Sequence, residues 1–351
     1  MRVFADRHHS GLAASLHYLL ENRLGHELYF PIGMEWEERG YWKIHEPYNF
    51  AKETARQFLE INYTPNDGTN PLNNLTFVPQ DGVHHIWDFN NEYYQKAITF
   101  QKFLELDIDI VIASIPAHVP AYRKMLKDIG SPAKLIYQIG NIEWHNQVPW
   151  DMVDGVMASV KEFPVPNGKH AVFYRQEFNI DFFDQSNLLT EDRVTSFVNC
   201  LPKPDYFLNL EKELSEYTFK SYGIACRDGI YQSVREIANE MGRSMFGYHL
   251  KPGGDGFGHV IHNWFAAARP VLVNISDYKD KLAGELLEDM VTCIDISTRS
   301  PNQVAGIVRE LVQSGYNKMR ETVDERFKQV VDFDRDANKV EVFINELMQT
   351  L

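Results

Sequence analysis

One stretch decides the fold: Tyr248-His-Leu-Lys-Pro-Gly-Gly-Asp-Gly-Phe-Gly-His-Val-Ile-His-Asn-Trp-Phe-Ala-Ala-Ala-Arg-Pro-Val-Leu-Val273. The partly apolar run 244–250 predicts a buried strand, and four glycines then follow within six positions, at 253, 254, 256 and 258. Apolar residues recur at helical spacing over 259–268, and Arg269-Pro270 ends that helix before the valine-rich run 271–273. The order strand, glycine loop, helix and strand predicts a parallel α/β unit.

The glycine loop suits an anion, because glycine lets the backbone approach a ligand closely and the first N–H groups of a helix carry partial positive charge. The amides of residues 256–259 are therefore candidate phosphate ligands, with Lys251 and Arg227 as candidate cations. An ordinary glycine-rich turn explains the same spacing. Lys251 is equally well a solvated surface lysine, and Arg227 could simply pair with Asp228.

The stretch resembles the donor-binding segment of GT-B glycosyltransferases, particularly the family-4-like group. Asp255-Gly-Phe-Gly258 matches the start of that segment, and the run 266–271 matches its end, with Ala268 where glycine is usual. Asn263 stands where the family has a glutamate that contacts the donor ribose. The resemblance implies two Rossmann-like domains facing a central cleft, and it implies these donor-binding residues: Arg227, Lys251, Asp255, Gly256, Phe257, Gly258, His259 and Asn263.

Composition limits the classes of partner. The chain has 351 residues, enough for two domains, with 44% hydrophobic and 24% charged residues. A net charge of −14 argues against a broad nucleic-acid or membrane-docking surface. The N-terminal residues do not resemble a signal peptide, and no apolar run is long enough to span a membrane. The three cysteines are far apart, as expected of free thiols in the cytoplasm.

The first domain is predicted over residues 1–184, beginning with a strand at 2–6, a helix at 10–24 and a strand at 26–31. Further strands are expected at 108–113 and 134–139, and further helices at 93–106 and 119–129. Ligands bind at the carboxyl ends of strands in such sheets. The polar residues that follow the strands are therefore candidate acceptor-binding residues: Ser10, Gly11, His118 and Asn141.

His8 and His9 are the candidate catalytic bases, because an imidazole titrates near neutral pH and they directly follow the first strand. Asp6 could orient either ring. In the alternative interpretation these histidines only cap the following helix or bind water. A retaining reaction would require no such base.

The donor-binding domain is predicted over 194–335, and a terminal helix at 336–351 could pack back on the first domain. We expect a glycosyltransferase that moves a sugar from a UDP- or GDP-sugar to a hydroxyl acceptor, with the nucleotide sugar as co-substrate and neither a metal nor another cofactor. A nucleotide-sugar epimerase of the same fold and an inactive sugar-nucleotide binding protein are the alternatives.

Overall fold

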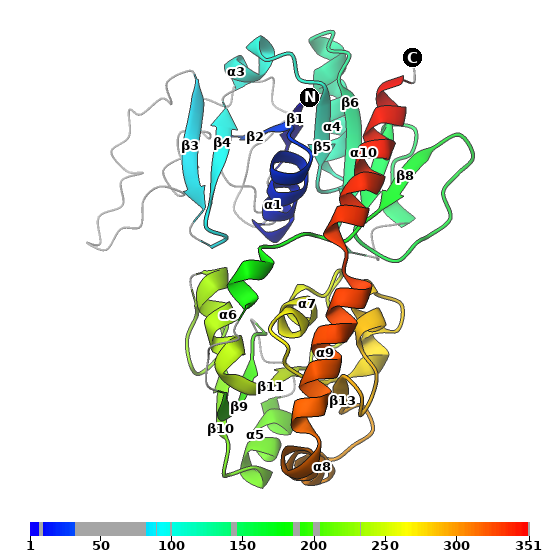
Figure 1. Cartoon of the computed structure of the whole chain (residues 1–351). Helices are drawn as coiled ribbons and strands as arrows, with labels where there is room; N and C mark the ends of the chain where they lie inside the picture. The colour runs from blue at the N-terminus through cyan, green and yellow to red at the C-terminus, as the bar shows by residue number, and fades with distance from the viewer. Residues whose placement is uncertain are drawn as a thin grey trace. The chain divides into compact units, whose positions relative to one another are not determined.

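The computed structural model describes residues 1–6, 10–31, 82–88, 90–98, 100–141, 146–184, 190–198, 204–231 and 233–349. The chain forms two compact units (Figure 1). Unit 1 contains Met1–Phe178 and Phe333–Leu351, and unit 2 contains Asn179–Asp332. The chain therefore passes between the units twice.

Unit 1 is built on a sheet of eight strands within the described residues, in the order β3-β4-β2-β1-β5-β6-β7-β8. The β3–β4 pair is antiparallel and the other pairs are parallel. The strands are β1 (Arg2–Ala5), β2 (Glu27–Pro31), β3 (Val83–Asp88), β4 (Tyr93–Ile98), β5 (Ile110–Ala113), β6 (Lys134–Ile139), β7 (Gly155–Ala158) and β8 (His170–Phe173).

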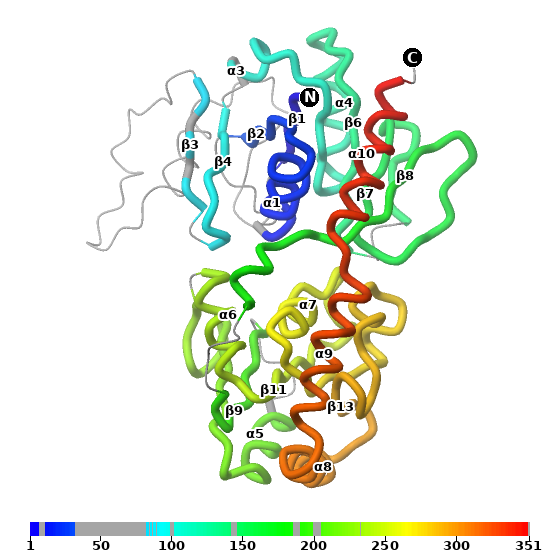
Figure 2. Tube along the Cα trace, in the orientation of Figure 1, coloured from blue at the N-terminus to red at the C-terminus, as the bar shows by residue number. Residues whose placement is uncertain are grey.

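Alternating side chains of these strands pack on two helical layers. One face buries Phe4, Val111 and Tyr137 against α3 (Phe100–Glu105) and α4 (His118–Asp128). The other face buries residues such as Val3 and Ile112 against three helical segments: α1 (Ser10–Leu16), the π-helical η1 (His17–Arg23) and the C-terminal α10 (Phe333–Gln349). Figure 2 shows that α10 runs beside β8, and the two elements are in contact.

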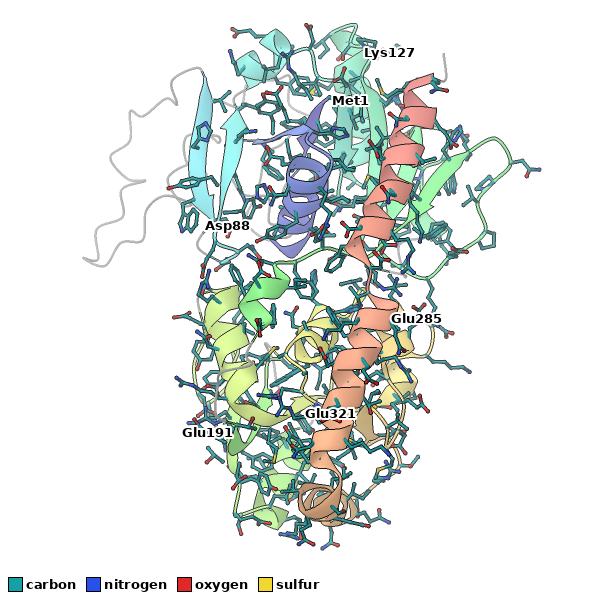
Figure 3. All side chains as sticks on the ribbon, viewed as in Figure 1. Met1, Asp88, Lys127, Glu191, Glu285 and Glu321 are labelled. Atoms are coloured by element: carbon teal, nitrogen blue, oxygen red, sulfur yellow. The ribbon has the colours of Figure 1, made fainter. Side chains whose placement is uncertain are left out.

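The prediction of one helix over 93–106 was wrong. Residues 93–98 form β4, and the helix covers only Phe100–Glu105. Burial along β4 alternates, since Tyr93 and Gln95 are buried whereas Tyr94 is 60% exposed, and this period of two belongs to a strand. Asp88, labelled in Figure 3, closes the β3–β4 turn by accepting the N–H groups of residues 90 and 91 at 2.9 and 3.1 Å.

Unit 2 is built on a parallel sheet of five strands in its described part, in the order β10-β9-β11-β12-β13. The strands are β9 (Glu191–Ser196), β10 (Thr218–Ser221), β11 (Ser244–His249), β12 (Val271–Val273) and β13 (Cys293–Asp295). The helical segments are η5 (Ile180–Phe183), α5 (Pro204–Glu213), α6 (Val234–Arg243), α7 (His259–Ala266), η6 (Ile275–Tyr278), η7 (Leu282–Leu286), α8 (Pro301–Ser314) and α9 (Tyr316–Val330). One face of the sheet packs on α5 and α8.

In the structure, the first segment of unit 1 ends at Phe178 and unit 2 begins at Asn179. The reason is that Phe182 and Phe183 are buried and η5 packs on α6, so this short helix belongs to unit 2. The terminal helix begins at Phe333, just before the predicted position 336. No helix among the described residues is long and apolar enough to cross a bilayer.

Candidate functional site

The glycine loop lies at the carboxyl end of β11 and leads directly into α7, as the sequence predicted. Gly254 and Gly258 have φ angles of +66° and +87°. A Cβ at Gly258 would lie 2.5 Å from the Cβ of Ala283, and a Cβ at Gly254 would lie 2.7 Å from the carbonyl oxygen of Asp277. Both the backbone conformation and the packing of η6 and η7 therefore require glycine at these two positions.

Asp255 is held from three sides. Its Oδ2 atom accepts hydrogen bonds from Nε2 of His249 at 2.9 Å and from the hydroxyl of Tyr278 at 3.3 Å, and its Oδ1 atom pairs with Lys251. Because an ionised carboxylate only accepts, Nε2 of His249 must carry the proton. These contacts tie the glycine loop to β11 and to η6.

The charge of Asp255 follows from these contacts. Burial acts to raise the pKa of this carboxyl, but the hydrogen bond from His249 and the charges of His249 and Lys251 outweigh it, so the pKa lies well below its usual range. Burial raises the pKa of Tyr278 and keeps its hydroxyl protonated. Asp255 therefore stays ionised, and its charge is balanced locally.

Several buried polar atoms of β11 and α7 make no hydrogen bond within the described residues, and two of them concern the donor hypothesis. They are Nδ1 of His249 and Oδ1 of Asn263. Buried polar groups are normally hydrogen-bonded, so these two atoms mark a place where a ligand hydroxyl or N–H group could bind. Asn263 comes from α7 and His249 from β11.

Phe257 and His259 lie at the start of α7. Phe257 is buried and stacks on the ring of His262 with centroids 4.2 Å apart, and it meets His259 edge-on at 4.9 Å. His262 approaches the carbonyl oxygen of Gly258 with Nδ1 at 2.9 Å. Phe257 and His262 therefore belong to the packing of the helix, and His259 remains partly accessible at the first helical position.

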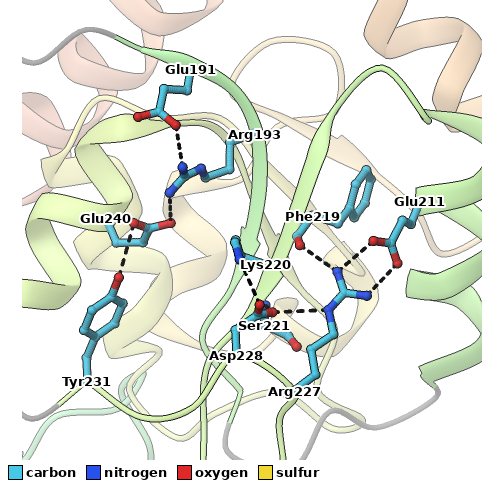
Figure 4. Close-up of polar contacts among 10 residues, drawn as sticks. All are labelled: Glu191, Arg193, Glu211, Phe219, Lys220, Ser221, Arg227, Asp228, Tyr231 and Glu240. Carbon is cyan, nitrogen blue, oxygen red and sulfur yellow. Dashed lines mark hydrogen bonds and ion pairs between the residues drawn. The ribbon is translucent and has the colours of Figure 1, made fainter.

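The structure places Arg227 in a separate network (Figure 4). Its two terminal nitrogens donate to Glu211 at 2.8 and 2.7 Å, its Nε donates to Asp228 at 3.2 Å, and Nη2 also donates to the carbonyl oxygen of Phe219 at 2.6 Å. Arg227 lies in the turn after β10, and β10 is separated from β11 by β9. The described contacts therefore do not bring Arg227 together with Lys251.

In unit 1 the structure joins two residues that the sequence suggested separately. Asp6, at the end of β1, is buried; its Oδ1 accepts the N–H of Ser114 at 2.9 Å, and its Oδ2 lies 2.8 Å from Nδ1 of His118. Ser114 follows β5, and His118 begins α4. An imidazole oriented by a buried carboxylate is an arrangement that can move a proton.

The other acceptor-side candidates are distributed along the same edge of the sheet. Ser10 and Gly11 begin α1, and Asn141 follows β6 and is half-buried. His8 and His9 lie outside the described residues. The predicted pairing of Asp6 with one of them is thus untested, and the contacts that are described for Asp6 are with β5 and α4.

A chain of buried polar groups supports this edge. The hydroxyl of Ser114 donates to Gln138 at 3.3 Å, the amide of Gln138 donates to the hydroxyl of Tyr174 at 2.8 Å, and the amide of Gln176 donates to Ser159 at 3.0 Å. Burial raises the pKa of Tyr174 to about 12. These groups are satisfied by each other, so they fix the backbone that carries Asp6 and His118.

Within the described ranges, no group of three or more His, Cys, Asp or Glu side chains is arranged to hold a metal ion. Sequence reasoning missed His249 and Tyr278 as partners of Asp255. His249 could have been predicted, because it is the last residue of the strand that leads into the loop. Tyr278 lies 23 positions beyond Asp255, and only the fold brings it there.

Comparison by sequence gives no match to a protein-family model or to a curated protein. Solved structures do match over almost the whole chain. A glycosyltransferase from Rickettsia africae superposes with a TM-score of 0.59 at 14% identity, covering 100% of this chain and 99% of that one. HepE of Anabaena in complex with UDP gives 0.56 at 13% identity, covering 98% and 99%.

Sucrose-phosphate synthase of Thermosynechococcus elongatus gives a TM-score of 0.56 at 11% identity and covers 100% of both chains. These proteins are glycosyltransferases of the GT-B fold. The likeness extends over both units; the sheet of unit 2 is parallel, and that of unit 1 is parallel except for the β3–β4 pair. The chain therefore has the GT-B fold that the glycine stretch predicted.

Proposed function

We propose that the chain transfers a sugar from a nucleotide-sugar donor to a hydroxyl acceptor. The observation that carries this proposal is the glycine loop, which leads from Lys251 and its partner Asp255 into the amino end of α7. The similar HepE structures contain UDP, UDP with glucose, or UDP-glucose, which supports a nucleotide sugar as the donor.

We assign the donor diphosphate to the backbone amides of Gly256, Gly258 and His259 and to the ammonium group of Lys251. Lys251 is about half exposed, so it can turn from Asp255 to a phosphate at little cost. The buried Oδ1 of Asn263 is suited to accept one hydroxyl of the donor ribose.

Arg227 fits the donor site less well than Lys251. Its guanidinium group would first have to leave Glu211 before it could reach a phosphate, because both terminal nitrogens already donate to that carboxylate. The phosphate charge is therefore assigned to the helix end and Lys251, with no metal ion required.

For the acceptor side we propose that His118 receives the proton of the attacking hydroxyl when the reaction inverts the sugar. Asp6 orients the ring through Nδ1, so Nε2 is the nitrogen that would take the proton. His8 and His9 remain candidates for the same role from the sequence. Cys293 is a buried free thiol, which supports a reducing compartment such as the cytoplasm.

The test is incubation of the full chain with UDP-, GDP- and dTDP-sugars, with and without EDTA, followed by chromatography of the nucleotides and sugars. Slow release of free sugar and nucleoside diphosphate, unaffected by EDTA, is expected of a metal-independent transferase that lacks its acceptor. Formation of an isomeric nucleotide sugar would show an epimerase instead. Binding without any turnover would show a sugar-nucleotide binding protein.

A further inference from the structure

The two places where the chain passes between the units are tied together inside unit 1. The outgoing segment ends at Phe178, and the returning segment begins at Phe333. The rings of these two residues meet edge-on with centroids 5.6 Å apart, and both side chains are buried. Arg175, a little before the first crossing, donates its N–H to Asp336 at 2.9 Å. The two segments are therefore in direct contact.

Arg23, the last residue of η1, binds both segments at once. Its Nε lies 2.7 Å from both carboxylate oxygens of Glu177 on the outgoing segment, and its Nη1 pairs with Asp334 on the returning segment. Its guanidinium carbon lies 6.0 Å from the centre of the Phe333 ring. Glu177 is buried, whereas Asp334 is 83% exposed, so the bond to Glu177 is the stronger of the two.

On the unit 2 side of each crossing, the chain is held by contacts within a few residues of the boundary. Asn179 caps η5 by accepting the N–H of Asp181 at 3.1 Å, and Arg235 of α6 lies 4.1 Å from the ring centre of Phe182. At the second crossing, the N–H of Val331 still donates to the α9 residue Phe327 at 2.8 Å. Unit 2 therefore holds its own end of each crossing through contacts close to the boundary.

We propose that Arg23 is a clamp that fixes both crossing segments on unit 1. Arg23 bonds to Glu177 and lies over the ring of Phe333, and Phe178 packs on that same ring. Loss of Arg23 is therefore expected to loosen both segments, even though the exposed pair with Asp334 contributes little. This inference concerns the mechanics of the chain and does not depend on the chemistry proposed above.

The test is hydrogen–deuterium exchange of the full chain, comparing the wild type with Arg23→Met, Glu177→Gln and Asp334→Asn. Arg23→Met should speed exchange in peptides spanning 174–178 and 333–337 by about tenfold to a hundredfold, the effect of losing charge-assisted hydrogen bonds. Glu177→Gln should reproduce most of this increase. Asp334→Asn, which removes only the exposed pair, should change exchange less than about threefold.

Peptides of β5 and β6 serve as an internal reference for unit 1, and peptides of α9 serve for unit 2. All three should keep the wild-type exchange rate in every variant. Faster exchange in only one crossing segment, or in neither, would overturn the clamp. Faster exchange of β5 and β6 to the same extent as the crossings would also overturn it, because Arg23 would then stabilise unit 1 as a whole.

Discussion

Replacing Asp255 with asparagine tests the account of the glycine loop most directly. The carboxylate accepts charge-assisted hydrogen bonds from His249 and Lys251, and only the second of these partners is substantially exposed. Such bonds contribute about 1.5–3 kcal/mol each when buried. Since asparagine keeps one accepting oxygen, we expect Asp255→Asn to lower the free energy of unfolding of unit 2 by about 2–3 kcal/mol at pH 7.

The loss of stability caused by Asp255→Asn should become smaller at low pH. The pKa of Asp255 is lowered in the folded protein from its ordinary value of 3.8, so its contribution is complete above that value and is lost as the pH falls toward the folded pKa. The difference between wild type and Asp255→Asn should therefore be constant from pH 7 to about pH 5. Below about pH 4 it should shrink by about 1.4 kcal/mol for each pH unit.

The assay is a urea titration of the full chain read by pulsed hydrogen exchange in peptides of β11 and α7, so that unfolding of unit 2 is followed separately. Asp324→Asn is the control, since Asp324 pairs with Lys328 on the exposed surface of α9 at 2.6 Å and should contribute less than about 0.5 kcal/mol. The same loss at pH 3 as at pH 7 would refute the ionised network around Asp255.

Four further outcomes follow from the structure. His118→Ala should lower turnover of an inverting transfer by about a hundredfold to ten-thousandfold with donor affinity unchanged, as measured by steady-state kinetics; unchanged turnover would remove its role as base. Lys251→Ala should weaken binding of a nucleoside diphosphate in calorimetry by more than it weakens binding of the nucleoside, and equal losses would show that Lys251 does not touch phosphate. Gly258→Ala should destabilise unit 2 by more than about 2 kcal/mol in a denaturant titration, because the new Cβ would meet Ala283 and φ is positive; a change below 0.5 kcal/mol would contradict the packing. Ala268→Gly should instead stabilise it by up to about 1 kcal/mol, since Ala268 has a φ of +51°, and a loss of stability would show that its methyl group matters more than its backbone strain.

Local sequence patterns were enough to predict the strand and the helix on either side of the glycine loop. The run from Tyr248 to Val273 contains its own strand, glycine turn, helix and second strand, because the spacing of apolar residues and the glycines act over a few positions. The same reasoning failed at residues 93–98, where pairing with β2 and β3 made a strand of a segment whose residue types also suit a helix.

Which side chains meet was decided by the tertiary structure alone. Asp6 and His118 are 112 positions apart, and only the pairing of β1 with β5 brings the ends of their elements together. Arg227 appeared equivalent to Lys251 in the sequence, but a carboxylate from α5 holds it. The sequence by itself determined the fold and the glycine loop, because these depend on short-range periodicity and backbone conformation. Which charged side chains pair with each other depends on contacts between elements that are distant in the sequence. Local sequence patterns therefore do not predict these pairs.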